Sequence, residues 1–254
     1  MKEFFGIHWQ KTAVGGFILL LTGLLLAGRG SAQEQSAQTS AQKREQIESR
    51  RFSGHNQHTI PEKLSGTSGD LFVHAHLATI DIPGPANPPP YPPYQLVGMA
   101  CASDAVVLGT AASHTSHLTA DNTFLYSDWT FTVNQVLKNN AKASMSANSV
   151  ITIARPGGQI ETNGRKVYAI DDNFAAFHSG DQYLLFLQFI EQVGTYEAKA
   201  ENVFRISGEK VGHLTQHAMT NLEDEGADTL IRETRDAIDA ASTKPYCVGG
   251  AKKP

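Results

Sequence analysis

Two closely spaced pairs of histidines are the residues of this chain whose type and spacing fit a chemical role. His74 and His76 are two residues apart, so on a strand both imidazoles would point to one face. His114 and His117 are three residues apart, in a predicted loop. Imidazole nitrogens bind zinc and copper, and a closed zinc site takes about four ligands. Either pair would supply two ligands, so a metal site stays open here beside the alternative of solvated or capping histidines.

Motifs that mark catalytic sites are absent from the sequence. There is no Gly-x-Ser-x-Gly, no His-Glu-x-x-His, no phosphate-binding loop and no Cys-x-x-Cys. No cofactor is indicated. The sequence therefore favours a non-catalytic protein, and only the histidines leave a metal-dependent enzyme as an alternative.

The chain has two cysteines, Cys101 and Cys247. In an oxidising compartment two distant cysteines are expected to form one disulfide. Such a bond would close a loop around nearly the whole folded region and would stabilise it by about 5 kcal/mol. The alternative is a pair of buried, unpaired thiols.

A series of predicted strands from residue 104 onward would position the histidines and cysteines. Short apolar or alternating runs predict strands at residues 104–112, 124–137, 150–154, 164–170, 183–190, 195–198 and 203–206. A helix is expected at residues 222–241, where apolar side chains form one stripe and acidic residues crowd the first turns. Six or seven short strands with one terminal helix predict an antiparallel barrel or sandwich, and we expect an OB-like barrel of about six strands.

Aromatic residues of the stretch 124–137 divide between two faces. Odd positions are apolar and even positions are mostly polar, so one face is expected to be buried. Trp129 lies on the apolar face and is predicted to be core. Phe124 and Tyr126 lie on the other face and are candidates for surface recognition. Arg155, at the end of the strand 150–154, could present its guanidinium at the rim of the barrel.

The first 32 residues have the layout of a secretory signal peptide. An apolar run at residues 13–27 follows a weakly basic start, and small residues precede a cut between Ala32 and Gln33. A membrane span needs about 20 apolar residues, more than this run has. The protein is therefore expected to be secreted or periplasmic. The rival interpretation is an uncleaved, single-pass anchor, which would be its contact with a membrane.

Residues 33–100 form a low-complexity, Pro-rich leader. Residues 33–70 hold few large apolar side chains and are predicted to be disordered. Residues 71–82 could be a strand, and whether that strand joins the barrel stays open. The run 83–94 favours extended polyproline geometry, and we interpret it as a stiff spacer.

The charge balance argues against nucleic acid as a partner. The whole chain carries a formal charge of -4, and cleavage would leave 18 basic against 24 acidic residues, about -6. A phosphate-binding domain normally has a strong basic excess. The partner is expected to be a protein or a glycan.

Four segments carry a resemblance to a known family: "CASDAVVLGT", "FTVNQVLK", "VITIARPGG" and "GDQYLLFL". They resemble secreted bacterial domains of unassigned role that share an OB-like, netrin-type barrel. Netrin modules and tissue inhibitors of metalloproteases begin with a similar Cys and "VV.G", and they link that Cys to a later one. The resemblance covers roughly residues 101–215. It implies a closed barrel of five or six strands with a C-terminal helix packed against it, within a domain at residues 101–250.

Three hypotheses for function follow. The favoured one is an exported binding or scaffold domain without catalysis. The second is a metal-binding protein or metal-dependent enzyme that uses the histidine pairs. The third is a netrin-type protease inhibitor. Such inhibitors place an N-terminal Cys on the target's zinc, whereas about 68 residues would precede Cys101 after cleavage. Inhibition by that route would need processing at Cys101.

Overall fold

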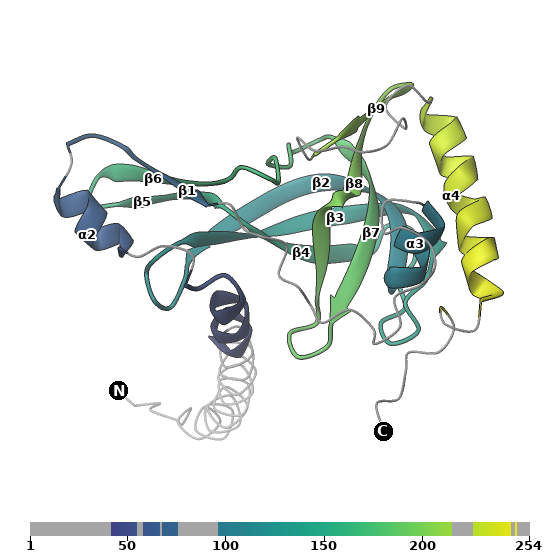
Figure 1. Ribbon diagram of the computed structural model, residues 1–254, viewed down its shortest axis with the longest axis horizontal. Coiled ribbons are helices and arrows are strands. Elements are labelled where there is room, and N and C mark those ends of the chain that lie inside the picture. The colour runs from purple at the N-terminus through teal and green to yellow at the C-terminus, as the bar shows by residue number, and fades with distance from the viewer. Residues whose placement is uncertain are drawn as a thin grey trace, which may run out of the picture. The chain divides into compact units, whose positions relative to one another are not determined.

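The computed structural model (Figure 1) describes residues 42–54, 58–66, 68–75, 96–214, 226–244 and 247. The chain divides into two units, residues 1–45 and 46–254, and the fold described here is that of the second. The predicted signal peptide, the Pro-rich run 83–94 and His76 lie outside the described residues.

The second unit is mainly β. Residues 46–51 are helical, and the elements that follow are α2 (Ile60–Ser65), β1 (Leu71–Ala75), α3 (Leu96–Ala102), β2 (Ala105–Leu118), β3 (Leu125–Lys138), β4 (Val150–Pro156), β5 (Gly158–Thr162), β6 (Arg165–Asp171), β7 (Gln182–Ile190), β8 (Thr195–Ser207), β9 (Lys210–His213) and α4 (Ala227–Ser242). The two strands predicted at 195–198 and 203–206 are one continuous strand, β8. The helix predicted at 222–241 is confirmed as α4, with its described start at Ala227.

Six strands form an OB-like barrel sheet in the order β4-β3-β2-β7-β8-β9. All neighbours in this order pair antiparallel. A parallel pairing of β4 with β8, at Ile153–Tyr196 and Ala154–Glu197, closes a ring of five strands, and β9 extends β8 as a hairpin. Register shifts between β2 and β3 fit the bending that long strands need in a barrel. The predicted OB-like barrel with a C-terminal helix is therefore confirmed.

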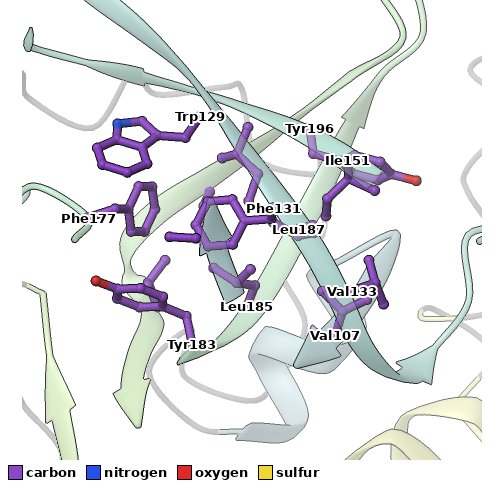
Figure 2. Packing of buried hydrophobic residues seen from close by; sticks show 14 of the residues in the cluster. Val107, Trp129, Phe131, Val133, Ile151, Phe177, Tyr183, Leu185, Leu187 and Tyr196 are labelled. Carbon is purple, nitrogen blue, oxygen red and sulfur yellow. The ribbon is translucent and has the colours of Figure 1, made fainter. Parts of the chain in front are cut away.

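The barrel interior is a cluster of aliphatic and aromatic side chains from all five ring strands (Figure 2). Trp129 is only 4% exposed and lies edge-on to Phe177, with ring centroids 5.6 Å apart. The prediction that Trp129 is core is confirmed. Phe131 contacts both Phe177 and Tyr183 edge-on. The period-two pattern of β3 thus has its expected physical cause, an apolar face turned into the barrel.

Outside the barrel, α3 and α4 cover one face of β2, β7 and β8. Leu230 and Ala241 of α4 belong to the same buried cluster as Phe186 and Phe204 of the barrel. The apolar stripe of α4 is the cause, because an amphipathic helix gains free energy by burying that stripe. In Figure 1 both helices lie on the β7 side of the barrel.

A second, three-stranded sheet has the order β1-β6-β5. β1 runs parallel to β6, from Leu71 opposite Val167 to Ala75 opposite Asp171. The strand predicted at 71–82 is therefore described over residues 71–75, and it joins this small sheet rather than the barrel sheet. The chain passes from one sheet to the other at Pro156–Gly158, since β4 belongs to the barrel sheet and β5 to the small sheet.

Two glycines make this connection possible. Gly157 has a φ of 86°, which side-chain-bearing residues rarely adopt. A Cβ on Gly158 would lie 2.3 Å from Ser127 Oγ and 2.4 Å from Ser116 Oγ. These two hydroxyls are 3.0 Å apart, and Ser127 also donates a hydrogen bond to the Gly157 carbonyl. The small sheet is therefore held close to the barrel by backbone that only glycine allows.

The prediction of disorder for residues 33–70 is wrong for the part that the structure describes. Phe52, Ile60 and Leu64 are buried in a cluster with the inner face of the small sheet and the start of β3. Thr59 and Glu62 form a reciprocal capping box that starts α2. These three apolar side chains suffice to fix the described part of the segment, because the strands already provide the surface that buries them.

Candidate functional site

The two cysteines form the predicted disulfide. Cys101 of α3 is bonded to Cys247, which follows α4, and their Cα atoms are 4.9 Å apart. Both residues pack against the cluster between the helices and the barrel. The disulfide is a structural link between the segments of α3 and α4.

His114 and His117 lie in strand β2, so the prediction that they occupy a loop is wrong. The His114 ring is stacked on Trp129 with centroids 4.3 Å apart. The His117 ring is stacked on Tyr126, and its Nε2 is 3.3 Å from Asp128 Oδ2. Three residues apart on a strand, the two imidazoles point to opposite faces, which prevents them from sharing a metal ion.

His74 lies on β1 with its Nδ1 3.0 Å from Asp172 Oδ1. Its predicted companion His76 is outside the described residues. Among the residues that the structure does describe, no three His, Cys, Asp or Glu side chains gather as a metal site would require.

Arg155 is buried, so the prediction that it stands exposed at the barrel rim is wrong. Its guanidinium lies over the rings of Phe174 and Phe177, 4.8 and 5.8 Å from their centroids, and donates a hydrogen bond to the Phe174 carbonyl. Burial lowers the pKa of Arg155 to about 10, and Asp171 partly opposes this change. The side chain therefore remains charged at neutral pH and fastens the loop 172–181 to the barrel.

Phe124 and Tyr126 are buried, with 0% and 1% of their surface exposed, so their predicted place on an open face is wrong. The outer face of β3 is covered at its start by the cluster that includes Phe52 and Leu71. The Tyr126 ring is stacked on Phe52 and on His117. Neither aromatic residue is accessible to a ligand while this cluster is in place.

The outward face of the small sheet carries an exposed apolar cluster that the sequence analysis missed. Phe72 of β1 is 59% exposed and Ile170 of β6 is 38% exposed. Tyr168 lies opposite Phe72 in the parallel register, and their rings are stacked 4.8 Å apart at 10°. We name Phe72, Tyr168 and Ile170 the aromatic face. The outward positions of "LFVHA" and "RKVYAID" carry the only sequence signal for it.

Polar side chains surround the aromatic face. Exposed His74 lies opposite Ile170, Gln159 lies opposite Tyr168, and Glu161 lies opposite Lys166. An apolar centre with a mixed polar rim is the composition of a protein recognition surface.

A shallow hollow of about 240 Å³ lies on the other side of the small sheet. It is formed mainly by Ile60 and Leu64 of α2, Leu118 and Ile160. The Arg165 guanidinium at its edge donates hydrogen bonds to the carbonyls of Leu64 and Gly69. The hollow is smaller than the usual range for small-molecule sites, about 300–1,000 Å³.

Asp121, in the turn between β2 and β3, provides a test of acid stability. Burial alone would raise its pKa, but hydrogen bonds from Thr119, Gly54 and Thr123 together hold the pKa below its ordinary value of 3.8. Because the pKa of Asp121 is lower in the folded state than in the unfolded chain, its carboxylate stabilises the fold at pH values above 3.8. This contribution is lost as the pH falls through the folded-state pKa. We expect Asp121→Asn to lower stability at pH 7 and to flatten the fall in stability below pH 3.8.

Urea denaturation at a series of pH values between 2 and 7 measures this effect. Asp236→Asn, an exposed position on α4, is the matched control. Parallel pH profiles for Asp121→Asn and the unchanged protein would contradict the assignment.

No helix in the described part of the chain has the length and apolar character required to cross a membrane. Neither a protein-family model nor a curated protein matches the chain.

Proposed function

We propose that this protein is an exported, non-catalytic binding module that recognises a protein partner through the aromatic face. The single observation that carries the proposal is the 59% exposure of Phe72, stacked on Tyr168 beside exposed Ile170. Solvent-exposed apolar clusters with a polar rim mark interaction surfaces.

The chemistry of the face favours a polypeptide over a glycan. Ile170 offers an aliphatic surface, which packs well against apolar side chains. β1 pairs only with β6 among the described residues, so it is an edge strand of its sheet there. Edge strands accept an added strand through main-chain hydrogen bonds, while neighbouring side-chain surfaces give specificity. A protein segment lying along β1 could use both features at once.

The Cys101–Cys247 bond supports an exported location, because disulfides persist in oxidising compartments. The same bond supports a netrin-type relationship, since it links the segment before the first barrel strand to the segment after the C-terminal helix. Protease inhibition through an N-terminal Cys is disfavoured by the position of Cys101 inside helix α3. The histidine pairs are not part of the proposal.

We expect the double variant Phe72→Ala/Tyr168→Ala to lose at least tenfold in capture of the protein partner from an extract of the producing cell envelope. The reason is that both rings would be buried in the complex, and such anchors dominate binding energy. Quantitative mass spectrometry of captured proteins is the measurement. Val150→Ala is the matched control, because Val150 is 67% exposed on the barrel, away from the small sheet.

Thermal unfolding of the double variant is expected to stay close to that of the unchanged protein, since exposed side chains contribute little to stability. A partner captured equally by the double variant would contradict the proposal. Saturable binding on a glycan array that is lost in the double variant and kept in Val150→Ala would contradict a protein partner. It would show that the aromatic face binds a glycan.

A further inference from the structure

Residues 46–54, here named the strap, lie against the barrel at the turn between β2 and β3. Ser49 Oγ accepts a hydrogen bond from the Ala120 amide. The Gly54 amide donates to Asp121 Oδ2 at 2.8 Å. Figure 1 shows the helical turns of this segment in purple, beside that turn. The strap is thus fixed to the β2–β3 turn at two points, its middle and its C-terminal end.

The strap also contacts the start of β8 through charged groups. Glu48 is fully buried and accepts a hydrogen bond from Thr195 Oγ1 at 2.8 Å. Arg51 is 2.7 Å from the Glu48 carboxylate through one nitrogen and 2.5 Å from Glu197 Oε2 through the other. Arg51 therefore bridges one carboxylate of the strap and one of the barrel.

An aromatic contact completes the docking. Phe52 is 3% exposed, and its ring is stacked on Tyr126 of β3 with centroids 5.4 Å apart. The Arg51 guanidinium lies over the same Phe52 ring at 5.5 Å. The strap thus presents one acid, one cation and one ring, and each has its own partner on the barrel: Thr195, Glu197 and Tyr126.

The barrel partners Tyr126 and Glu197 flank strand β4. Tyr126 pairs with Pro156 at one end of β4, and Glu197 pairs with Ala154. In chain order, β3 and β4 are the second and third strands of the ring. In OB barrels, ligands bind on the face of strands two and three. The loop between strands one and two and the loop between strands four and five border this face. The strap therefore lies on the face that corresponds to the ligand-binding face of OB barrels.

The docking of the strap depends on a few side chains, because removing one member of the buried Glu48–Arg51 pair leaves the other charge uncompensated. A buried ion pair adds little net stability, because both charges lose their hydration. A tethered segment binds at an effective concentration in the millimolar range, so even weak contacts keep it docked. A free segment with the same groups would compete with it once the strap is weakened.

We propose that the strap is a ligand bound in cis, and that the barrel face beneath it binds a partner helix with the pattern Glu-x-x-Arg-Phe. Arg of the partner would pair with Glu197, its Phe would stack on Tyr126, and its Glu would accept the hydrogen bond from Thr195. This surface is separate from the aromatic face and goes beyond the proposed function. The strap would regulate access by occupying the site until a partner displaces it.

Binding of a fluorescent peptide with the sequence of residues 42–54 tests this. We expect at least tenfold tighter binding to the Arg51→Ala/Phe52→Ala protein than to the unchanged protein, because the cis competitor is weakened. Adding Glu197→Gln to that variant should weaken peptide binding at least fivefold. Arg50→Ala is the matched control, since Arg50 is exposed on the same helix and should leave peptide binding as in the unchanged protein.

Equal peptide affinity for the unchanged and the double-variant protein, with both folded by circular dichroism, would overturn the proposal. Hydrogen exchange of the unchanged protein gives a second test that needs no variant. Amides of residues 46–54 should exchange at least tenfold faster than those of β3, and excess peptide should accelerate them further. Exchange of the strap only together with β3 would show a segment that opens by global unfolding, and would also overturn the proposal.

Discussion

Replacing both cysteines, as Cys101→Ser/Cys247→Ser, is expected to lower the free energy of unfolding by about 5 kcal/mol. The bond joins residues 146 positions apart, so it excludes a large set of open conformations from the unfolded chain. It also holds α3 beside the end of α4, where both helices cover the barrel. Urea denaturation of the double variant against the oxidised protein measures the difference.

The double substitution avoids the free thiol that a single replacement would leave. The oxidised protein treated with a reductant is the matched control, and its loss of stability should equal that of the double variant within about 1 kcal/mol, the usual scale of one neutral contact. A loss below about 1 kcal/mol in both would mean that the unfolded chain is compact without the bond, contrary to the chain-entropy argument.

The substitution Phe131→Ala is expected to lower the free energy of unfolding by about 3–5 kcal/mol. Phe131 is fully buried, and its ring lies edge-on to Phe177 at 5.0 Å and to Tyr183 at 5.9 Å (Figure 2). Truncation would remove the hydrophobic contribution of the ring and leave a cavity between side chains of separate strands and the loop 172–181. Those elements cannot collapse into the cavity without breaking the ring of strand pairings.

Thermal and urea unfolding of Phe131→Ala should be compared with Phe131→Leu and with Phe72→Ala. Leu refills much of the space, so its cost should be smaller than that of Ala. Phe72→Ala removes the same group from an exposed position and should change stability by only about 0.5 kcal/mol. Equal losses for Phe131→Ala and Phe72→Ala would show that the barrel interior does not carry the stability assigned to it.

The alternation and the apolar runs of the sequence predicted the barrel well, because each of these patterns lies within a single strand. The alternation from Trp129 to Val133 identified the inward face of β3, and the apolar run of β7 identified a central strand. The cysteine count predicted the disulfide without any knowledge of geometry. These inferences needed only the two-residue period of a strand and the chemistry of thiols in an oxidising compartment.

The candidate sites could not be predicted in the same way. A two-residue period separates two faces but does not say whether another element covers the second one. Phe124 and Tyr126 were therefore expected on an open face, while Phe52 and the small sheet bury them. Phe72 and Tyr168 meet only because β1 pairs in parallel with β6, and nothing within either strand encodes that distant pairing.

The separation of the two cysteines has a consequence for biosynthesis. Cys247 is synthesised 146 residues after Cys101, an interval of roughly 7–30 s at about 5–20 residues per second. Throughout that time Cys101 has no native partner, while the strands between them are completed in order. The sequence holds no third cysteine, so until Cys247 is synthesised the thiol of Cys101 can form a disulfide only with another molecule. The native bond therefore forms only after all the barrel strands have been synthesised.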